Sequence, residues 1–371
     1  MGAGERAVED MGGLMELDFY RGKKVLVTGH TGFKGTWLTK MLADAGAEVT
    51  GFALAPAGEP ALWTLSGMAG RIRSVEGDIR DLGALGRIFE EVQPEIVLHL
   101  AAQPIVRTSY AEPVYTYETN VMGTVHICEC VRKSRSVRSF LNVTTDKVYE
   151  NREEQARAYR EDEPLDGYDP YSNSKSCSEL VTHSYRKSYF DELGIPVSTA
   201  RAGNVIGGGD FAADRIIPDC VRAVTAGKTI AVRNPNSVRP YQHVLEPLRA
   251  YLMIAAQQYE DPSLAGAYNV GPDESDCLTT GELAELFCRA WGEGASWRAE
   301  NAGGPHEANF LKLDCSKLKN TFGWRPSWCA QTAVGKTVEW SKEWASDPAS
   351  VPAVMERQIR EFFSDTRGAS A

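Results

Sequence analysis

Two side chains four residues apart could act together in proton transfer. Tyr171 and Lys175 stand in the segment Tyr-Ser-Asn-Ser-Lys, which opens a stretch that we predict to be helical. Residues i and i+4 share one helix face, so the Lys175 ammonium can approach the Tyr171 phenol and stabilise its phenolate. A tyrosine, with its ordinary pKa of about 10, needs such a neighbouring charge to serve as a base. The pair therefore predicts acid–base chemistry on a hydroxyl group.

A second group, Thr145, Asp146 and Lys147, follows the apolar run Ser-Phe-Leu-Asn-Val directly. Open α/β sheets bind ligands at the carboxyl ends of their strands, where this group would lie. Thr145 can hydrogen-bond a sugar hydroxyl, and Asp146 can donate a proton if burial raises its pKa. The structural alternative is that Asp146 and Lys147 form a surface ion pair.

A glycine loop lies between a β-branched run and an amphipathic stretch. Gly29, Gly32 and Gly35 have the spacing G-x-x-G-x-x-G. In such a loop the first glycine permits a tight turn, the second lets the backbone reach a pyrophosphate at the helix N-terminus, and the third allows close packing. The loop predicts a dinucleotide site for NAD. It also contains His30, Phe33 and Lys34, and we expect His30 and Lys34 to add positive charge unless Lys34 is a solvated helix side chain.

Cofactor preference and the rest of the cofactor site follow from the next strand ends. The second strand ends without the acid that usually holds the adenosine ribose of NAD, which predicts a weak preference for NAD over NADP. Asp78, beside Ile79, can accept a hydrogen bond from adenine or instead cap a helix. The remaining candidates are the small or apolar residues Leu100, Ala101 and Ala102, together with Asn120 and Thr144.

Strand patterns alternate with helix patterns through the first 205 residues. This alternation predicts a Rossmann-type, doubly wound parallel sheet with a smaller C-terminal α/β substrate-binding lobe. We expect strands near 23–28, 47–54, 72–79, 95–102, 139–145 and 195–206, and helices near 36–46, 82–94, 113–134 and 171–194. The expected divisions are an arm at 1–17, a nucleotide domain at 18–205, a lobe at 206–340 interleaved with it, and a helical, surface-bound tail at 341–371. The polar segment 151–170 is expected to form a loop over the site.

Composition narrows the classes of protein that remain. The 371 residues carry a net charge of −10, which argues against nucleic-acid binding, and 43% of them are hydrophobic, as in ordinary globular proteins. We find no apolar stretch long enough for a membrane span and no signal peptide. The eight cysteines show no C-x-x-C spacing, so we predict reduced thiols, a cytoplasmic protein and no metal site.

Taken together, the motifs resemble those of the extended short-chain dehydrogenase/reductase family, and within it the nucleotide-sugar 4,6-dehydratases. The resemblance rests on Val-Thr-Gly-His-Thr-Gly-Phe-Lys-Gly, Thr-Thr-Asp-Lys, Tyr-Ser-Asn-Ser-Lys and Arg-Pro-Tyr-Gln-His-Val, and runs from about residue 18 to 340. It implies NAD-dependent oxidation, elimination of water and reduction within a nucleotide-diphosphate hexose, with CDP-glucose as the expected substrate. Lys147 departs from the glutamate of related enzymes, which leaves the base at C5 of the sugar open.

The diphosphate of such a substrate requires cationic side chains and backbone donors. We expect substrate contacts from Arg107, Thr145, Asn204, Arg215, Arg233, Arg239 and His243, with a structural salt bridge as the alternative for each arginine. Arg201 lies in the same part of the chain. By resemblance, Asn204 would lie near the pyrophosphate and Arg239 would contact phosphate or nucleotide.

Two other functions share most of these residues. A nucleotide-sugar 4-epimerase needs NAD, Tyr171 and Lys175 but lacks an acid such as Asp146, so Asp146 favours dehydration. A non-catalytic NAD-sensing protein would usually lack Tyr171 or Lys175. The resemblance also implies a homodimer formed through the helices near 113–134 and 172–193.

Overall fold

The computed structural model describes residues 15–153, 157–292, 294–300 and 310–368. Most of the expected N-terminal arm, residues 1–14, lies outside the described residues. Residues 15–17 belong to a 3₁₀ turn, Met15–Tyr20, which places Leu17 and Tyr20 in the core. The Tyr20 hydroxyl donates a hydrogen bond of 2.7 Å to the Leu252 carbonyl, so the chain is already fixed to the core at this point.

Seven parallel strands form the central sheet, in the order β3-β2-β1-β4-β5-β6-β11. Their bounds are β1 Lys24–Thr28, β2 Glu48–Ala53, β3 Arg73–Glu76, β4 Ile96–His99, β5 Ser139–Val143, β6 Val197–Ala202 and β11 Ala267–Val270. Every residue of β4, β5 and β6 is buried, as expected for strands covered on both faces. The predicted fold class is confirmed, and β11 adds a strand that the sequence pattern had not separated from the lobe.

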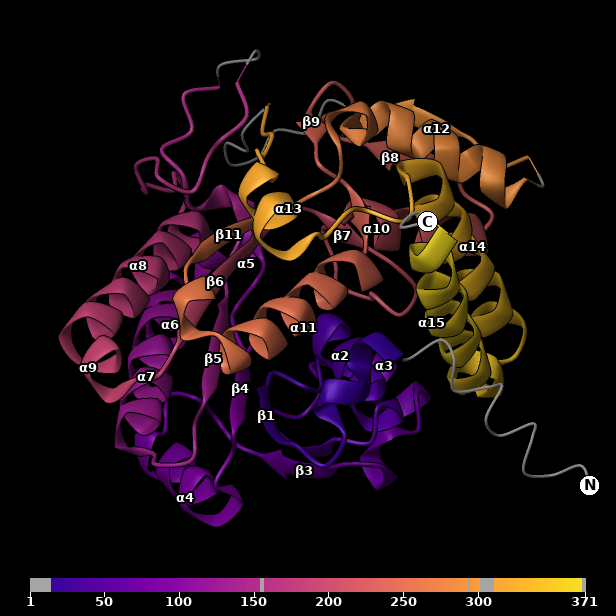
Figure 1. Cartoon of the computed structure of the whole chain (residues 1–371). Helices are drawn as coiled ribbons and strands as arrows, with labels where there is room; N and C mark the ends of the chain where they lie inside the picture. Colours follow the sequence, from indigo (N-terminus) through magenta and orange to yellow (C-terminus); the bar gives the residue numbers. More distant parts are fainter. Residues whose placement is uncertain (1–14, 154–156, 293, 301–309, 369–371) are drawn as a thin grey trace, which may run out of the picture.

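Helices cover the sheet on both sides (Figure 1). One face packs against α2 (Phe33–Asp44) and α11 (Leu245–Glu260), and the other against α4 (Leu82–Val92), α7 (Gly123–Lys133) and α8 (Pro170–Tyr185). The apolar cluster on the first face extends to α15 (Val351–Gly368). The long helices predicted near 113–134 and 171–194 are present, each with a single π-helical turn inside it. The shorter helices are α3 Leu62–Leu65, α5 Val106–Ala111, α6 Pro113–Tyr117, α9 Asp191–Leu193 and α13 Ser316–Phe322.

The strand order reverses between β1 and β4, which creates a crevice at the carboxyl edge of the sheet. The glycine loop follows β1, Leu100 follows β4, and Thr144 follows β5, so their backbones meet at this edge. Ligands of doubly wound sheets bind at such a switch point.

The second lobe has its own core above this edge. It contains α10 (Ile216–Thr225), α12 (Thr280–Trp291), α14 (Ala330–Ser346) and three two-stranded sheets, and Phe287 and Val232 are fully buried in its centre. The small sheets pair β7 Val205–Ile206 with β10 Gln242–His243, β9 Val238–Arg239 with β12 Leu278–Thr279, and β8 Ile230–Val232 with β13 Trp297–Ala299. Between these pieces the chain returns to the central sheet as α11 and β11.

Two expectations about surface segments are corrected. The described residues of the 151–170 loop pack beside the sheet edge: Tyr159 stacks on Tyr149 at 5.2 Å, and Glu161 accepts the Asn269 backbone N–H at 2.8 Å. The C-terminal tail is helical, but its apolar side chains, including Met355 and Phe362, are fully buried in the main core. Both segments therefore contribute to packing: Tyr159 belongs to a buried cluster with Val148 and Leu313, and the Phe362 ring contacts that of Trp328 at 5.1 Å.

Candidate active site

A cavity of about 510 Å³ opens between the carboxyl edge of the sheet and the second lobe. It brings together most of the residues singled out from the sequence. Those that line it are Phe33, Lys34, Leu100, Ala102, Arg107, Thr144, Thr145, Asp146, Lys147, Tyr171, Lys175, Asn204, Arg215, Arg233 and Arg239. No described residue between 151 and 170 borders it, so the described part of that loop does not cover the site.

Helix α8 presents Tyr171 and Lys175 to the cavity from its first two turns. The helix begins here because the Asp169 carboxylate accepts the Ser172 N–H at 3.0 Å and Pro170 occupies the first helical position. Lys175 is 4% exposed, and its Nζ donates a hydrogen bond of 3.0 Å to the Val143 carbonyl at the end of β5. Burial lowers the pKa of Lys175 to about 8.

The Tyr171 phenol is 9% exposed and faces Thr145. Burial raises its pKa to about 12, against the opposing influence of a hydrogen bond with Thr145 and of the Arg215 charge. In the free protein the phenol therefore keeps its proton at neutral pH. A bound ligand that adds positive charge or excludes water would change the pKa of Tyr171, because that pKa is set by the surroundings of the phenol.

Asp146 is 1% exposed and lies in the turn that follows β5. Its Oδ1 accepts a hydrogen bond of 3.0 Å from the Thr145 hydroxyl, and its buried Oδ2 has no hydrogen-bond partner. Burial raises the pKa of Asp146, while the charges of Lys147 and Arg239 oppose the rise. A carboxyl group with one unsatisfied, buried oxygen is suited to donating a proton to a ligand in the cavity.

The glycine loop fits a dinucleotide. Gly29 has φ +76°, and a Cβ there would lie 2.7 Å from the Ala101 nitrogen, while a Cβ at Gly35 would lie 2.1 Å from the Gly29 carbonyl oxygen. Only glycine can occupy either position. No side chain caps α2 at Gly32, so its first N–H groups are available to an anion. The residues present therefore match the requirements of a pyrophosphate-binding turn.

The expectation that His30 adds positive charge to the glycine loop is wrong. Its ring is fully buried against Trp63, and Nε2 is 2.7 Å from the Ser74 hydroxyl. Burial lowers the pKa of His30 to about 4, so the ring is neutral and cannot supply a charge for a 2′-phosphate. Lys34 points into the cavity and donates a hydrogen bond of 2.8 Å to the Tyr251 hydroxyl; burial and the charges of Lys175 and Arg215 lower its pKa to about 7. It is not a solvated side chain.

Several predicted cofactor residues lie near the crevice without bordering the cavity. They are Gly29, His30, Gly32, Gly35, Asp78, Ile79, Ala101 and Asn120. Asp81 caps α4, which leaves Asp78 at the sheet edge, where bonds from Arg80 lower the pKa of its carboxyl. Asn120 is buried and bonds both the Gln103 backbone and Ser174, so in this structure it joins two segments that border the site.

The lobe side of the cavity carries arginines that are paired with carboxylates. Arg233 contacts Asp214 at 2.8 Å, Arg107 contacts the same carboxylate at 3.6 Å, and Arg215 contacts Asp210 at 2.9 Å. Both acids line the cavity. Neither acid was among the residues predicted from the sequence.

His243, from the predicted substrate set, and Arg201, from the same part of the chain, do not reach the cavity. His243 is fully buried between the rings of Trp37 and Trp328 and does not border the cavity. Arg201 is 4% exposed and forms an ion pair of 3.0 Å with Glu179 behind the cavity wall. In both cases the side chain points into the core because a buried partner holds it there.

The doubly wound sheet, the glycine loop and the Tyr-x-x-x-Lys helix define a short-chain dehydrogenase/reductase of the extended type. The family model described as GDP-mannose 4,6 dehydratase matches residues 26–337, and the chain belongs to this family of nucleotide-sugar dehydratases.

Relatives agree with this assignment. The chain is 44% identical to a CDP-glucose 4,6-dehydratase of Salmonella typhimurium, over 95% of this chain and 99% of the relative. It is 29% identical to a dTDP-glucose 4,6-dehydratase of Xanthomonas campestris, over 85% and 92%. Among solved structures, DesIV, a dTDP-glucose 4,6-dehydratase of Streptomyces venezuelae with NAD bound, has a TM-score of 0.75 at 28% identity, covering 86% of this chain and 97% of that one. An NAD complex of UDP-glucose 4-epimerase from Thermus thermophilus has a TM-score of 0.74 at 26% identity, covering 86% and 98%.

Proposed function

We propose that this protein converts CDP-glucose to CDP-4-keto-6-deoxyglucose and water, with NAD as a cofactor that is restored in each cycle. The observation that carries the proposal is the placement of the Tyr171–Lys175 pair and the buried Asp146 carboxyl in one cavity. The 44% identical relative, a CDP-glucose 4,6-dehydratase, supports the choice of nucleotide.

Bound NAD would supply the hydride acceptor at C4 of the sugar and later the hydride donor at C6. The glycine loop and the N-terminus of α2 would hold its pyrophosphate, and Asp78 would hold its adenine. Leu100, Ala102 and Lys175 border the cavity beside this path and would contact the nicotinamide half.

Tyr171 would take the proton of the C4 hydroxyl as the C4 hydrogen leaves. Lys175 would stabilise the resulting phenolate through its charge, which is the condition for a phenol of raised pKa to act as a base. Thr145, which faces the phenol, would hydrogen-bond the same sugar hydroxyl and align it.

Asp146 would then protonate the C6 hydroxyl, so that the C6–O bond breaks and water leaves. The 4-ketone acidifies the C5 hydrogen, which a base must remove. Lys147 lines the cavity next to Asp146 and is our candidate for this step. Lys147→Met with solvent-deuterium incorporation at C5 is the test: unchanged turnover with unchanged exchange assigns the proton to Tyr171 or to water instead.

Arginines of the lobe would bind the diphosphate. Arg107, Arg215 and Arg233 line the cavity, and their present partners are the carboxylates of Asp210 and Asp214. A diphosphate can take the place of a carboxylate at such a site because guanidinium groups bind both through paired hydrogen bonds. Arg239 and Asn204 would complete the nucleotide contacts.

The 4-epimerase alternative draws on the similar fold of a UDP-glucose 4-epimerase. Asp146 favours dehydration, since an epimerase has no leaving group to protonate and would gain nothing from a buried carboxyl there.

We also propose a homodimer that works in the cytoplasm. Helices α6, α8 and α9 and their π-helical turns expose large apolar side chains: Val114 (70%), Leu180 (54%), Leu193 (52%), Met122 (46%) and Tyr189 (43%). A second copy that covers this surface would remove it from water. The free thiols suit a reducing compartment. Leu180→Asp is expected to halve the mass measured by light scattering, and an unchanged mass contradicts the assignment.

The decisive experiment incubates the protein and NAD with CDP-, UDP-, dTDP- and GDP-glucose separately. Dehydration lowers the mass of the product by one water, whereas epimerisation leaves the mass unchanged. Loss of water from CDP-glucose in preference to the other three supports the proposal. An unchanged mass with all four substrates overturns it.

A further inference from the structure

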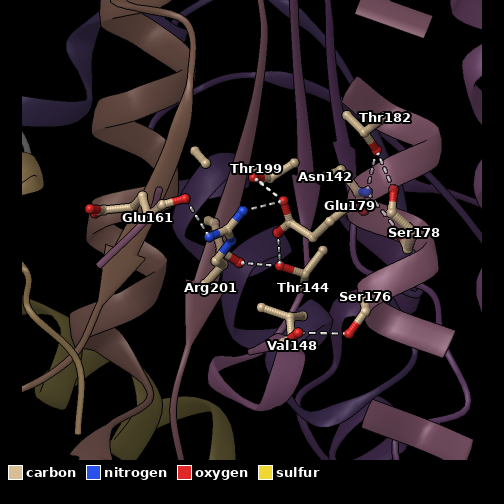
Figure 2. Close-up of polar contacts among 12 residues, drawn as sticks. Asn142, Thr144, Val148, Glu161, Ser176, Ser178, Glu179, Thr182, Thr199 and Arg201 are labelled. Carbon is tan, nitrogen blue, oxygen red and sulfur yellow. Dashed lines mark hydrogen bonds and ion pairs between the residues drawn. The ribbon is translucent and has the colours of Figure 1, made fainter. Parts of the chain in front are cut away.

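A buried carboxylate lies directly behind the reacting groups. Glu179 is on α8, one turn beyond Lys175, and is 4% exposed. Its Oε1 accepts a hydrogen bond of 2.5 Å from the Thr144 hydroxyl. Its Oε2 accepts bonds of 2.8 Å from Thr199 and 3.0 Å from Arg201 (Figure 2). One side chain of α8 is therefore bonded to groups on or directly after both β5 and β6.

Arg201, the partner of Glu179, is itself held on its other side. Its Nη1 donates to the Tyr149 hydroxyl at 2.9 Å and to the Glu161 carbonyl at 3.0 Å. Breaking a buried pair of this kind by removing one charge leaves the other uncompensated. Neither Glu179 nor Arg201 borders the cavity, so their ion pair holds the Glu179 carboxylate from behind the cavity wall.

The contacts of Glu179 determine where two reacting segments meet. Thr144, which it binds, directly precedes Thr145 and Asp146. Lys175, one turn earlier on α8, binds the Val143 carbonyl. Two successive turns of α8 are therefore attached to two successive residues at the end of β5, and the attachment sets the separation between the Tyr171 face and the Asp146 turn.

The same carboxylate influences the charge of Lys175. The titratable groups around Lys175 include Lys34 on α2, the neutral His99 on β4, Tyr171 on its own helix and Glu179. Burial of Lys175 opposes its charge, and Glu179 is the neighbour that favours it. A second cation, Lys34, lies close enough to Lys175 that the charge of Lys175 lowers the pKa of Lys34. The charged form of Lys175 therefore depends on a nearby negative charge.

We propose that Glu179 is a positioning residue for the reaction proposed above: locked by Arg201, it fixes the Tyr171–Lys175 face against the Asp146 turn and provides the counter-charge of the Lys175 ammonium. The inference rests on the proposed function for its effect on turnover. Its effect on Lys175 is a property of the protein alone.

Two substitutions separate the two roles. Glu179→Gln keeps the length and removes the charge. We expect the alkaline limb of the kcat–pH profile to move to lower pH by about one unit, so that the loss is about tenfold larger at pH 8.5 than at pH 6.5. Glu179→Asp keeps the charge and shortens the side chain, so it should lower kcat at every pH and leave the limb in place.

Glu246→Gln is the matched control. Glu246 on α11 is 1% exposed and accepts the backbone N–H groups of Ser327 and Trp328, away from α8. It is a buried glutamate like Glu179, but its hydrogen bonds go to Ser327 and Trp328 and not to the end of β5, so Glu246→Gln should leave the alkaline limb in place. If Glu179→Gln fails to fold because Arg201 is left uncompensated, the double variant Glu179→Gln/Arg201→Met removes both charges and is measured instead.

A second readout requires no substrate. The pH dependence of acetic-anhydride labelling of Lys175, measured by peptide mass spectrometry, reports the fraction of neutral amine. Glu179→Gln should shift this curve to lower pH by about one unit. A labelling curve and an alkaline limb that both stay at the wild-type pH overturn the inference. A wild-type protein that dehydrates none of the nucleotide-sugars while the labelling curve shifts overturns the proposed function and leaves this inference standing.

Discussion

The catalytic wall of the cavity, formed by α8 and the turn after β5, holds its polar groups through buried contacts that are already complete. Lys175 and Thr144 are at most 5% exposed, and each has a protein partner. The arginine wall, formed by Arg107, Arg215 and Arg233, is half-buried, and its ion pairs face the cavity.

This difference separates two requirements of the proposed reaction. Groups that move protons work best when their positions are set before the ligand arrives, because no reorganisation then accompanies the reaction. Groups that bind a diphosphate must exchange one anion for another. Partly exposed ion pairs, such as those of Arg107 and Arg233 with Asp214, contribute little to stability and can be exchanged at low cost.

Changing the phenol of the catalytic wall should have the largest effect. Tyr171→Phe removes the proposed base, and we expect kcat to fall about 1,000-fold with little change in binding of CDP-glucose. Turnover by mass spectrometry and binding by calorimetry measure the two quantities. Tyr168→Phe, at an exposed tyrosine on the same approach to α8, is the control. A Tyr171→Phe variant with a tenth of wild-type turnover would exclude the phenol as the base.

Asp146→Asn changes another residue of the catalytic wall and should affect a later step of the reaction, the elimination of water. We expect overall turnover to fall about 100-fold because the amide cannot donate the proton that water requires on leaving. Removal of the C5 hydrogen does not need this proton, so substrate recovered from deuterated water should carry deuterium at C5. Water loss at the wild-type rate would show that another group is the acid.

On the arginine wall, Arg233→Gln should weaken binding more than it slows chemistry. Loss of a hydrogen bond to a charged group is expected to raise KM by about 10-fold or more, with kcat nearly unchanged. Arg222→Gln, at an exposed arginine of α10 that does not line the main cavity, should leave both constants in place. A fall in kcat with constant KM would place Arg233 on the chemical step and remove the contrast between the walls.

The smallest effect is expected from Asp214→Asn, and it should be a gain. Asp214 has φ +61°, which asparagine tolerates, so the backbone should keep its conformation. Without the carboxylate, Arg107 and Arg233 lose an anion that competes with the diphosphate, and KM should fall by about threefold. A rise in KM would instead show that Asp214 orients the two arginines for binding.

The sequence predicted the parts of this molecule whose signals are local. Six strands were recognised. Most of them are short apolar runs, whereas β3, Arg73–Glu76, is polar and was recognised from its place in the alternation of strands and helices. Tyr171, Asp146 and Gly29 were recognised because each belongs to a motif within or directly beside a single element. β11 has only four residues, Ala267–Val270, in a region of mixed patterns, and its membership of the sheet depends on pairing with β6, which comes 65 residues earlier in the chain.

The missed site residues are those whose meaning arises only in three dimensions. Asp214 is of interest because of Arg107 and Arg233, and Glu179 because of Arg201. Each of these partners lies at least nineteen residues away in the chain. His243 shows the reverse error, because a polar residue inside a motif turned out to be enclosed by tryptophans. Side-chain direction and charge pairing across elements could not be inferred from one sequence.

The return of the chain to the central sheet as β11 has a consequence for any attempt to divide the protein. A fragment that ends near residue 205 would keep the glycine loop and Tyr171 but leave the hydrogen-bonding edge of β6 bare and one face of the sheet without α11. Such a piece would expose a ready template for intermolecular strand pairing. Nucleotide-sugar specificity is therefore better exchanged by grafting loops of the lobe than by swapping halves of the chain.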